Sequence, residues 1–281
     1  MTWKPTELSG VANLSASIPA TIEGEARELS ARRGISLDTL VGDALGRYVQ
    51  AHGRRLYQIS ASSALVEGVY AGSISSSDLL EHGDFGLGTF DGLDGEMVIL
   101  DGEIYQASQT IRHRTDDFLV PFAAITHFCT KSRFMIAEAA SLKDIELVCD
   151  RQRISDNLFY AFRLEGRFDT VHARAVHAVP QNTRLVDAAK AQWEFHFEGV
   201  EGTLVCFWSP HYSSAFSVPG YHFHFISKDR TKGGHVLDCS AQNLEVRIQV
   251  LSEYDIRLPE RGPFLTVGLS KDPTADLAKT E

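Results

Sequence analysis

The chain contains one stretch from which its architecture can be worked out, Gly220-Tyr-His-Phe-His-Phe-Ile-Ser-Lys-Asp-Arg-Thr-Lys-Gly-Gly-His235. Its first half alternates histidines with aromatic or aliphatic residues. In a strand, such alternation places every second side chain on the same face. His222 and His224 therefore share one face, with the aromatic side chains on the other. The polar segment that follows ends in Gly-Gly, which predicts a turn, and the chain returns at His235.

A hairpin of this kind places His235 opposite His224, with the two side chains about 5 Å apart on the shared face. Three imidazoles on adjacent strands form the base of a tetrahedral zinc site that keeps one position open. The alternative is that the three histidines only pack as half-buried strand residues. A third histidine directly after a Gly-Gly turn favours the metal site.

Length and composition indicate a globular protein. The chain has 281 residues, of which 43% are hydrophobic and 23% charged, enough for one large or two moderate domains. Its net charge of −10 argues against a protein that mainly binds nucleic acid or an anionic membrane. An anionic ligand must therefore be held by local positive charge.

Two further features predict a cytoplasmic protein. Residues 1–8 lack the basic and apolar segments of a signal peptide, and no apolar run reaches the roughly 18 residues of a membrane span. The cysteines are far apart and form no CxxC pair, which is typical of free thiols in a reducing compartment. They are Cys129, Cys149, Cys206 and Cys239.

Residues 1–55 differ from the rest of the chain. Leu14, Ala16 and Ile18 alternate with Asn13, Ser15 and Ser17, which predicts a short strand. Two helices should follow, one ending at Gly34 and one capped by Ser36. The order strand-helix-helix resembles a ribbon-helix-helix segment, which dimerises through its strands and in many proteins binds DNA. This segment has seven basic and six acidic residues and no basic residue on its ribbon, so dimerisation is expected rather than DNA binding.

From residue 56 onward the chain is rich in predicted strands. We expect an α+β fold dominated by twisted mixed or antiparallel sheets with a few packing helices, in two sheet subdomains at about 56–180 and 181–281. Asp94-Gly95 and Asp101-Gly102 predict hairpin turns. The apolar spacing over 134–147 predicts a helix.

Two charged residues are candidates for the site. Glu96 follows a predicted turn at the start of a strand, where it is either a solvated carboxylate or a functional one. Arg174 shares a predicted strand face with Phe168, Thr170 and His172, and an arginine among inward residues needs an anionic partner. That partner is either a structural carboxylate or a substrate.

Several motifs follow one another along the chain: Gly86-Leu-Gly-Thr-Phe-Asp-Gly-Leu-Asp-Gly-Glu96, Pro121-Phe-Ala, Asn157-x-Phe-Tyr-Ala-x-Arg163, Arg174, Gly202-Thr-Leu-Val and the histidine hairpin. In this order they resemble the α-acetolactate decarboxylase family over about 56–281. Their joint occurrence is more specific than any single motif.

The resemblance implies a homodimeric zinc lyase that converts 2-acetolactate to (R)-acetoin and carbon dioxide, a step of acetoin and 2,3-butanediol biosynthesis. It implies that His222, His224 and His235 bind the metal. It also implies that Glu96 and Arg174 are catalytic, that Arg174 and Thr89 bind substrate, and that a C-terminal glutamate takes part. Glu281 is the nearest candidate by position.

Two other classes of protein share parts of this pattern. A cupin-like metal enzyme also carries His-x-His on a strand, but it needs a glutamate a few residues later, and residues 225–229 contain none. A metabolite-sensing DNA-binding regulator would use residues 1–55 to bind DNA, and the missing ribbon charge argues against it.

Overall fold

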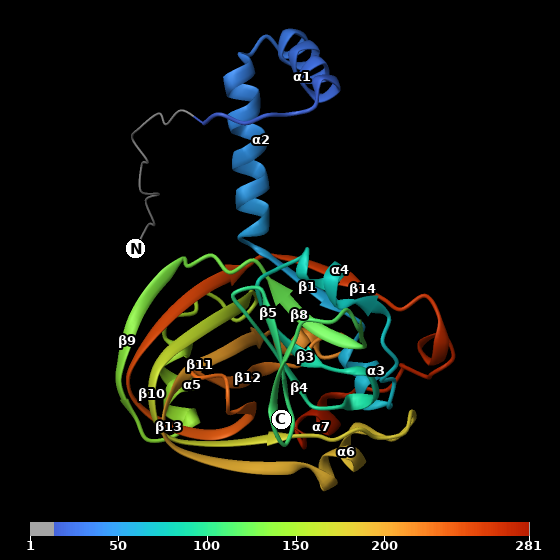
Figure 1. Cartoon of the computed structure of the whole chain (residues 1–281), viewed down its shortest axis with the longest axis vertical. Coiled ribbons are helices and arrows are strands. Elements are labelled where there is room, and N and C mark those ends of the chain that lie inside the picture. The colour runs from blue at the N-terminus through green and yellow to red at the C-terminus, as the bar shows by residue number, and fades with distance from the viewer. Residues whose placement is uncertain (1–13, 281) are drawn as a thin grey trace. The chain divides into compact units, whose positions relative to one another are not determined.

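The computed structural model describes residues 14–280, without the side chains of residues 47–52. The chain divides into two compact units, Met1–Val49 and Gln50–Glu281 (Figure 1). In the first unit, helix α1 spans Ala20–Arg33 and helix α2 begins at Leu37. Gly34 ends α1 in the left-handed conformation at φ 64°, as predicted. The Ser36 hydroxyl accepts a hydrogen bond from the backbone N–H of Thr39 at 3.0 Å, as expected of a cap.

The strand predicted around Leu14, Ala16 and Ile18 is not formed. Residues 14–19 have no regular secondary structure, and Asn13 lies outside the described residues. A strand is completed only by hydrogen bonds to a neighbouring strand, and alternation in the sequence does not supply that neighbour.

The first sheet of the second unit has seven strands in the order β14-β1-β8-β3-β4-β5-β6. Their bounds are β1 Arg55–Ile59, β3 Phe85–Thr89, β4 Glu96–Leu100, β5 Glu103–Ala107, β6 Ile111–Arg114, β8 Phe122–Thr126 and β14 Glu253–Arg257. Only β1 and β14 pair in parallel. The hairpin predicted at Asp101-Gly102 joins β4 to β5, and both residues have positive φ, 55° and 80°, as a tight two-residue turn requires. Strands β2 (Ile74–Ser75) and β7 (Leu119–Val120) form a separate pair.

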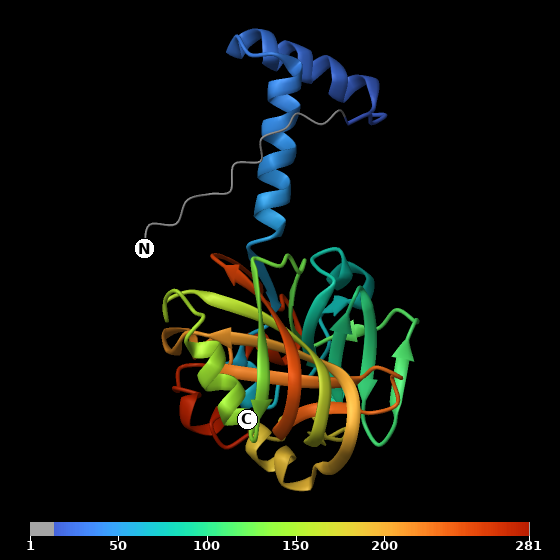
Figure 2. The same ribbon diagram turned by 90° about the vertical axis from the view of Figure 1, so that its left-hand side faces the viewer.

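The second sheet contains the longest strands. Its members are β9 Ser132–Ala139, β10 Phe159–Ala175, β11 Trp193–Ser209, β12 Gly220–Ser227 and β13 Gly233–Leu251, and they curve strongly (Figure 2). Strand β10 pairs with β11 on one edge and with β13 on the other, while β12 bridges β11 and β13. These four strands therefore close into a ring at the histidine hairpin.

Short helices connect and cover the sheets. They are α3 Ser62–Val66, α4 Ser76–Leu80, α5 Leu142–Asp150, α6 Leu185–Ala188 and α7 Thr274–Leu277, with 3-10 turns at Asp91–Leu93, Ala189–Ala191, His211–Ser213 and Gly262–Leu265. The helix predicted over 134–147 is wrong in its first half, because 132–139 pair with β13 as β9. The helix begins only after Ser141, whose hydroxyl accepts the N–H of Asp144.

Apolar residues fill three main layers of the second unit. One cluster lies within the ring and includes Phe162, Phe225 and Ile145 of α5. A second fills the space between the two sheets, and a third covers the far face of the first sheet. The predicted sheet-dominated α+β class is confirmed. The chain passes from the first sheet to the second between β8 and β9, and it returns to the first sheet at β14. Residue 180, where we expected the two sheet subdomains to meet, therefore lies in the part of the chain that forms the second sheet.

Among the described residues, none of the helices combines the length and the apolar character needed to cross a membrane.

Candidate metal centre and active site

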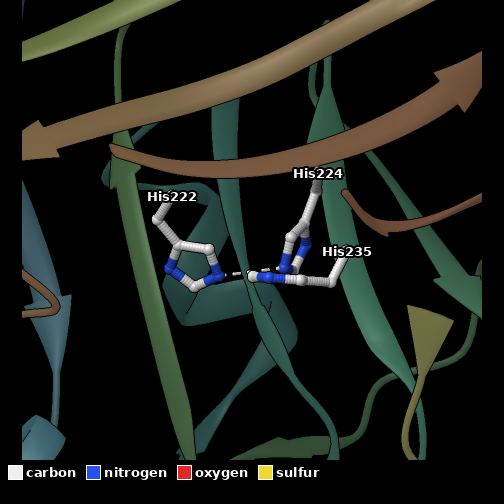
Figure 3. A group of neighbouring side chains, drawn as sticks. All are labelled: His222, His224 and His235. Atoms are coloured by element: carbon white, nitrogen blue, oxygen red, sulfur yellow. Dashed lines mark hydrogen bonds between the residues drawn. The ribbon is translucent and has the colours of Figure 1, made fainter. Parts of the chain in front are cut away.

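The histidine hairpin forms with the predicted register. His224 lies directly opposite His235, and the aromatic residues Phe223 and Phe225 point into the core of the ring. The three imidazoles lie on the other face and point toward one another (Figure 3). His224 and His235 are buried, while His222 is partly exposed.

Gly234 permits the close packing on which this hairpin depends. Its φ of 150° is one that residues with a side chain rarely adopt, and a Cβ here would lie 2.6 Å from the carbonyl oxygen of Arg174. The glycine thus lets β13 approach β10 closely just before His235. The turn predicted at Gly-Gly lies earlier, at residues 228–231, because Gly233 and Gly234 already pair with Ile226 and Phe225 as the first residues of β13. The second glycine meets this packing requirement instead.

The spacing of the imidazole nitrogens fits a tetrahedral metal ion. The Nε2 atoms of His222 and His224 are 3.2 Å apart, and one nitrogen from each of the three rings lies within 4.8 Å of the others. Metal–nitrogen bonds of about 2.0–2.1 Å at a tetrahedral angle place two ligand nitrogens about 3.3 Å apart. The three side chains could therefore hold one ion between them.

A backbone carbonyl fixes the tautomer of His224. Its Nδ1 lies 2.7 Å from the carbonyl oxygen of Met97 in β4. Because a carbonyl only accepts, Nδ1 carries the proton and Nε2 keeps its lone pair for a metal. The first sheet thus orients an imidazole that belongs to the second sheet.

Burial keeps all three imidazoles neutral. Desolvation lowers the pKa of His222 to about 3, with a further contribution from the charge of Arg174. Desolvation and then His222 lower the pKa of His224 to about 3, and the nearby Glu96 opposes this shift. The pKa of His235 is also lowered, by burial first and then by Arg174. Neutral imidazole is the form that binds metal.

Glu96 and Arg174 meet beside the histidines. Arg174 has an anionic partner, as predicted, and that partner is a carboxylate of the protein. The arginine is buried on β10 opposite His235, and its guanidinium lies 3.2 Å from Glu96 Oε1. The other carboxylate oxygen of Glu96 is 3.5 Å from His224 Nε2. Both carboxylate and guanidinium are less than a tenth exposed. The interpretation of Glu96 as a solvated turn carboxylate is therefore wrong.

Thr89 lies opposite Glu96 in the ladder between β3 and β4. It is buried, and its hydroxyl donates a hydrogen bond to the carbonyl oxygen of Gly95 at 2.8 Å. With its proton used in this way, the hydroxyl can serve a ligand only as an acceptor.

The C-terminal tail also reaches the site. Arg174 donates a hydrogen bond to the carbonyl oxygen of Thr280, which is buried. Glu281 lies outside the described residues. A cavity of about 420 Å³ borders Arg174 and Thr280, with Lys190, Lys279 and Gln192 among its lining residues.

The face of β10 that carries Arg174 differs from the prediction in one respect. The register with β13 shifts between Phe168 and Thr170, so Phe168 points into the ring core while Thr170, His172 and Arg174 point outward. A bulge of this kind reverses which residues face inward, and alternation alone does not reveal it.

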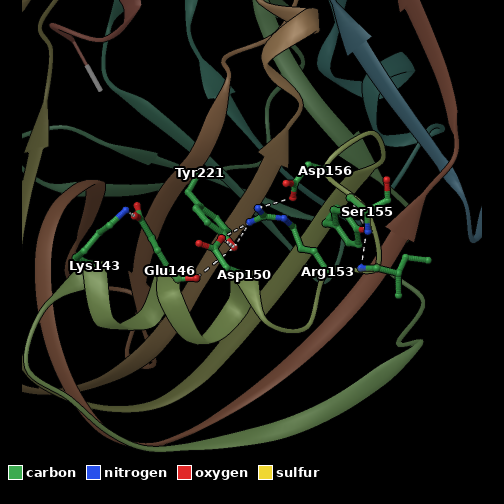
Figure 4. A network of polar contacts seen from close by, with 9 residues as sticks. Lys143, Glu146, Asp150, Arg153, Ser155, Asp156 and Tyr221 are labelled. Carbon is green, nitrogen blue, oxygen red and sulfur yellow. Dashed lines mark hydrogen bonds and ion pairs between the residues drawn. The ribbon is translucent and has the colours of Figure 1, made fainter. Parts of the chain in front are cut away.

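A polar network anchors the start of β12 next to His222 (Figure 4). Arg153 donates a hydrogen bond to the Tyr221 hydroxyl at 2.6 Å, and that hydroxyl lies 2.9 Å from Asp150. The guanidinium also stacks 3.9 Å above the ring of Trp208. Helix α5 is thereby tied to the strand that carries two of the three histidines.

Two groups of the site could not be identified from the sequence, namely the carbonyl oxygens of Met97 and Thr280. A backbone carbonyl acts through its position, and its residue type gives no signal. The pairing of Arg174 with Glu96 was also unspecified, since it joins residues of different sheets.

Residues 56–271 match the family model described as alpha-acetolactate decarboxylase. The chain is 42% identical over 229 residues to an alpha-acetolactate decarboxylase from Methanosarcina mazei, covering 80% of each chain. It is 35% identical over 232 residues to one from Brevibacillus brevis, again covering 80% of each.

Solved structures agree with the sequence comparisons. The crystal structure of alpha-acetolactate decarboxylase from Bacillus subtilis strain 168 superimposes with a TM-score of 0.78 at 35% identity, over 81% of this chain and 99% of that chain. The first 55 residues lie outside the family match.

Proposed function

Because the chain belongs to the alpha-acetolactate decarboxylase family and is a decarboxylase of that family, we propose that it converts 2-acetolactate to (R)-acetoin and carbon dioxide with zinc bound by His222, His224 and His235. One observation carries the zinc assignment: three neutral imidazoles converge beside a buried Glu96–Arg174 pair. The carbonyl that orients His224 supports the assignment, since ligand histidines commonly donate their second N–H in this way.

The donor set selects among metals. Imidazole nitrogen suits zinc and other late divalent ions, whereas magnesium and calcium prefer oxygen ligands. Three protein ligands with a fourth position open is the arrangement of a catalytic rather than a structural zinc site. When bound, zinc would supply Lewis-acid stabilisation of the negative charge that develops as carbon dioxide leaves.

Arg174 binds and orients the substrate. Its guanidinium presents several N–H donors in a fixed plane, which suits the substrate carboxylate and its oxygens. It is held from two sides by Glu96 and the carbonyl of Thr280. Because the chain is acidic overall, this local positive charge is what retains an anionic substrate.

Glu96 takes up a proton from solvent water and delivers it to the substrate after carbon dioxide has left. Breaking the bond between C1 and C2 releases carbon dioxide and leaves its electron pair as an enediolate, which must gain a proton at C2 to become acetoin. A carboxyl group held on one side of the substrate delivers that proton to one face and sets the chirality. Glu96 is the buried carboxylate at the histidines, and Glu281 is a second candidate because it follows Thr280 in the sequence. We assign Thr89 to the pocket wall beside Glu96.

The test combines metal analysis with turnover of racemic 2-acetolactate. We expect one zinc per chain and formation of acetoin in the wild type, and loss of both in His224→Ala. His211→Ala, which removes an exposed histidine elsewhere, serves as the control and should keep both. Bound zinc without acetoin would overturn the reaction, and active protein without metal would overturn the metal assignment.

We also propose that the enzyme is a homodimer and that residues 1–55 contribute to the interface. The described part of that segment exposes Leu14, Ile18, Ile22, Val41 and Leu45. Ile22 lies on helix α1, and Val41 and Leu45 lie on helix α2. Exposed apolar side chains of this kind are typical of a contact surface. Sedimentation of the full chain should show a dimer, weakened in Val41→Asp/Leu45→Asp. A monomeric wild type would contradict the homodimer, and an unchanged double variant would remove residues 1–55 from the interface.

A further inference from the structure

A second group of metal-ligating side chains lies on the outer face of β10 and β11. It consists of His172, Glu194 and His196, and one ligand atom from each lies within 4.8 Å of the others. None of the three belongs to the histidine hairpin, whose ligands come from β12 and β13. His172 precedes Arg174 by two residues on the same outward face.

Strand pairing brings these residues together. His172 and His196 are directly opposite in the ladder, and their rings stack with centroids 4.2 Å apart and planes inclined by 16°. Glu194 precedes His196 by two residues and so shares its face. Its Oε2 lies 3.0 Å from His172 Nε2.

The carboxylate of Glu194 is held in place. Gln192 donates a hydrogen bond to Oε1 at 3.1 Å, which leaves Oε2 directed at the imidazole. This hydrogen bond, followed by that with His172, lowers the pKa of Glu194, so the group is an anion at neutral pH. A ligand oriented by a neighbouring donor is a feature of built metal sites.

We propose that His172, Glu194 and His196 form a second metal site, for a divalent ion that favours imidazole, such as Zn²⁺, Ni²⁺ or Cu²⁺. Two nitrogens and one carboxylate oxygen suit these ions better than Mg²⁺ or Ca²⁺. The site is partly exposed, with 31% of the His172 side chain and 48% of the Glu194 side chain accessible. Water screens its charge and can complete its coordination, so the ion binds more weakly here than in the buried site.

The experiment is a zinc titration of protein whose tight site is already filled, followed by native mass spectrometry and calorimetry. The wild type should bind a second equivalent. In His196→Ala, and separately in Glu194→Gln, its affinity should fall at least tenfold. His224→Ala should lose the tight ion and keep the weaker one.

Glu198→Gln provides the matched control, because Glu198 is the next exposed carboxylate on the same face and lies outside the cluster. It should bind the second ion as the wild type does. Thermal unfolding of each variant confirms that it is folded. A wild type that binds one ion only, or a His196→Ala protein that binds the second as tightly as the wild type, overturns the proposal.

Discussion

Replacing Glu96 by glutamine separates the charge and proton of this side chain from its shape. The amide keeps an oxygen that can accept the hydrogen bond of Arg174, which lies at 3.2 Å in the wild type. It cannot donate a carboxyl proton. If Glu96 delivers the proton, kcat should fall about 10²-fold or more, the range of general acid catalysis. A hundredfold loss corresponds to about 2.7 kcal/mol in the activation free energy.

The same change should also lower stability. Arg174 is buried and would lose its charged partner, and removing one member of a buried pair costs about 3–5 kcal/mol. Because glutamine preserves the acceptor, we expect the free energy of unfolding to fall by less, about 1–3 kcal/mol. The variant should therefore remain folded with zinc bound, since its three imidazoles are unchanged.

The assay measures acetoin and its enantiomers by chiral chromatography, together with zinc per chain. Residual product should be closer to racemic, because water then protonates the enediolate from either side. Glu165→Gln is the control, since Glu165 pairs with Arg163 and Arg247 in the first half of β10, nine residues before Arg174. Near-normal turnover with a single enantiomer in Glu96→Gln would refute the assigned role.

Three more perturbations follow from the geometry. Gly234→Ala should shift β13 away from β10 and lower zinc affinity at least tenfold, measured by chelator competition, because its Cβ would lie 2.6 Å from the Arg174 carbonyl. Arg174→Lys should raise KM at least tenfold in steady-state assays with a smaller change in kcat, because an ammonium cannot contact Glu96 and the carbonyl of Thr280 in one plane. In metal-free protein, the pKa of His224 is lowered to about 3, whereas in the unfolded chain it is about 6.5. Between these two pH values the unfolded chain binds a proton that the folded protein does not. The free energy of unfolding should therefore fall as the pH drops from about 6.5 toward 3, by up to about 1.4 kcal/mol per pH unit. Urea unfolding at pH 7 and pH 5 should show that loss, and it should be smaller in His224→Ala.

The histidine hairpin was predictable because its signals are local. Alternation at His222 and His224, followed by a polar turn and a third histidine, specifies a register over a few residues, and the structure has that register. The tight turn at Asp101-Gly102 was predictable for the same reason. These patterns depend on neighbours along one hairpin and on no distant part of the chain.

The predictions that were wrong concern segments whose conformation depends on pairing with distant parts of the chain. The apolar spacing of 134–147 suits a helix, yet pairing with β13 draws its first half into β9. The shift after Phe168 turns that side chain into the ring core, which alternation through Arg174 did not predict. In both cases tertiary pairing outweighs the local preference.

The arrangement of the site follows from the closed ring together with one strand of the other sheet. Strands β10, β13 and β12 are neighbours, so Arg174, His235 and His224 form a row across them. Strand β4 then contributes twice, since Glu96 supplies the carboxylate and the next residue, Met97, supplies the carbonyl that orients His224. A displacement of β4 therefore changes the position of the Glu96 carboxylate and the orientation of the His224 imidazole together. Substitutions in the apolar layer between the sheets, where Val205 and Phe207 lie opposite His224 and His222, should consequently impair metal binding and turnover in parallel.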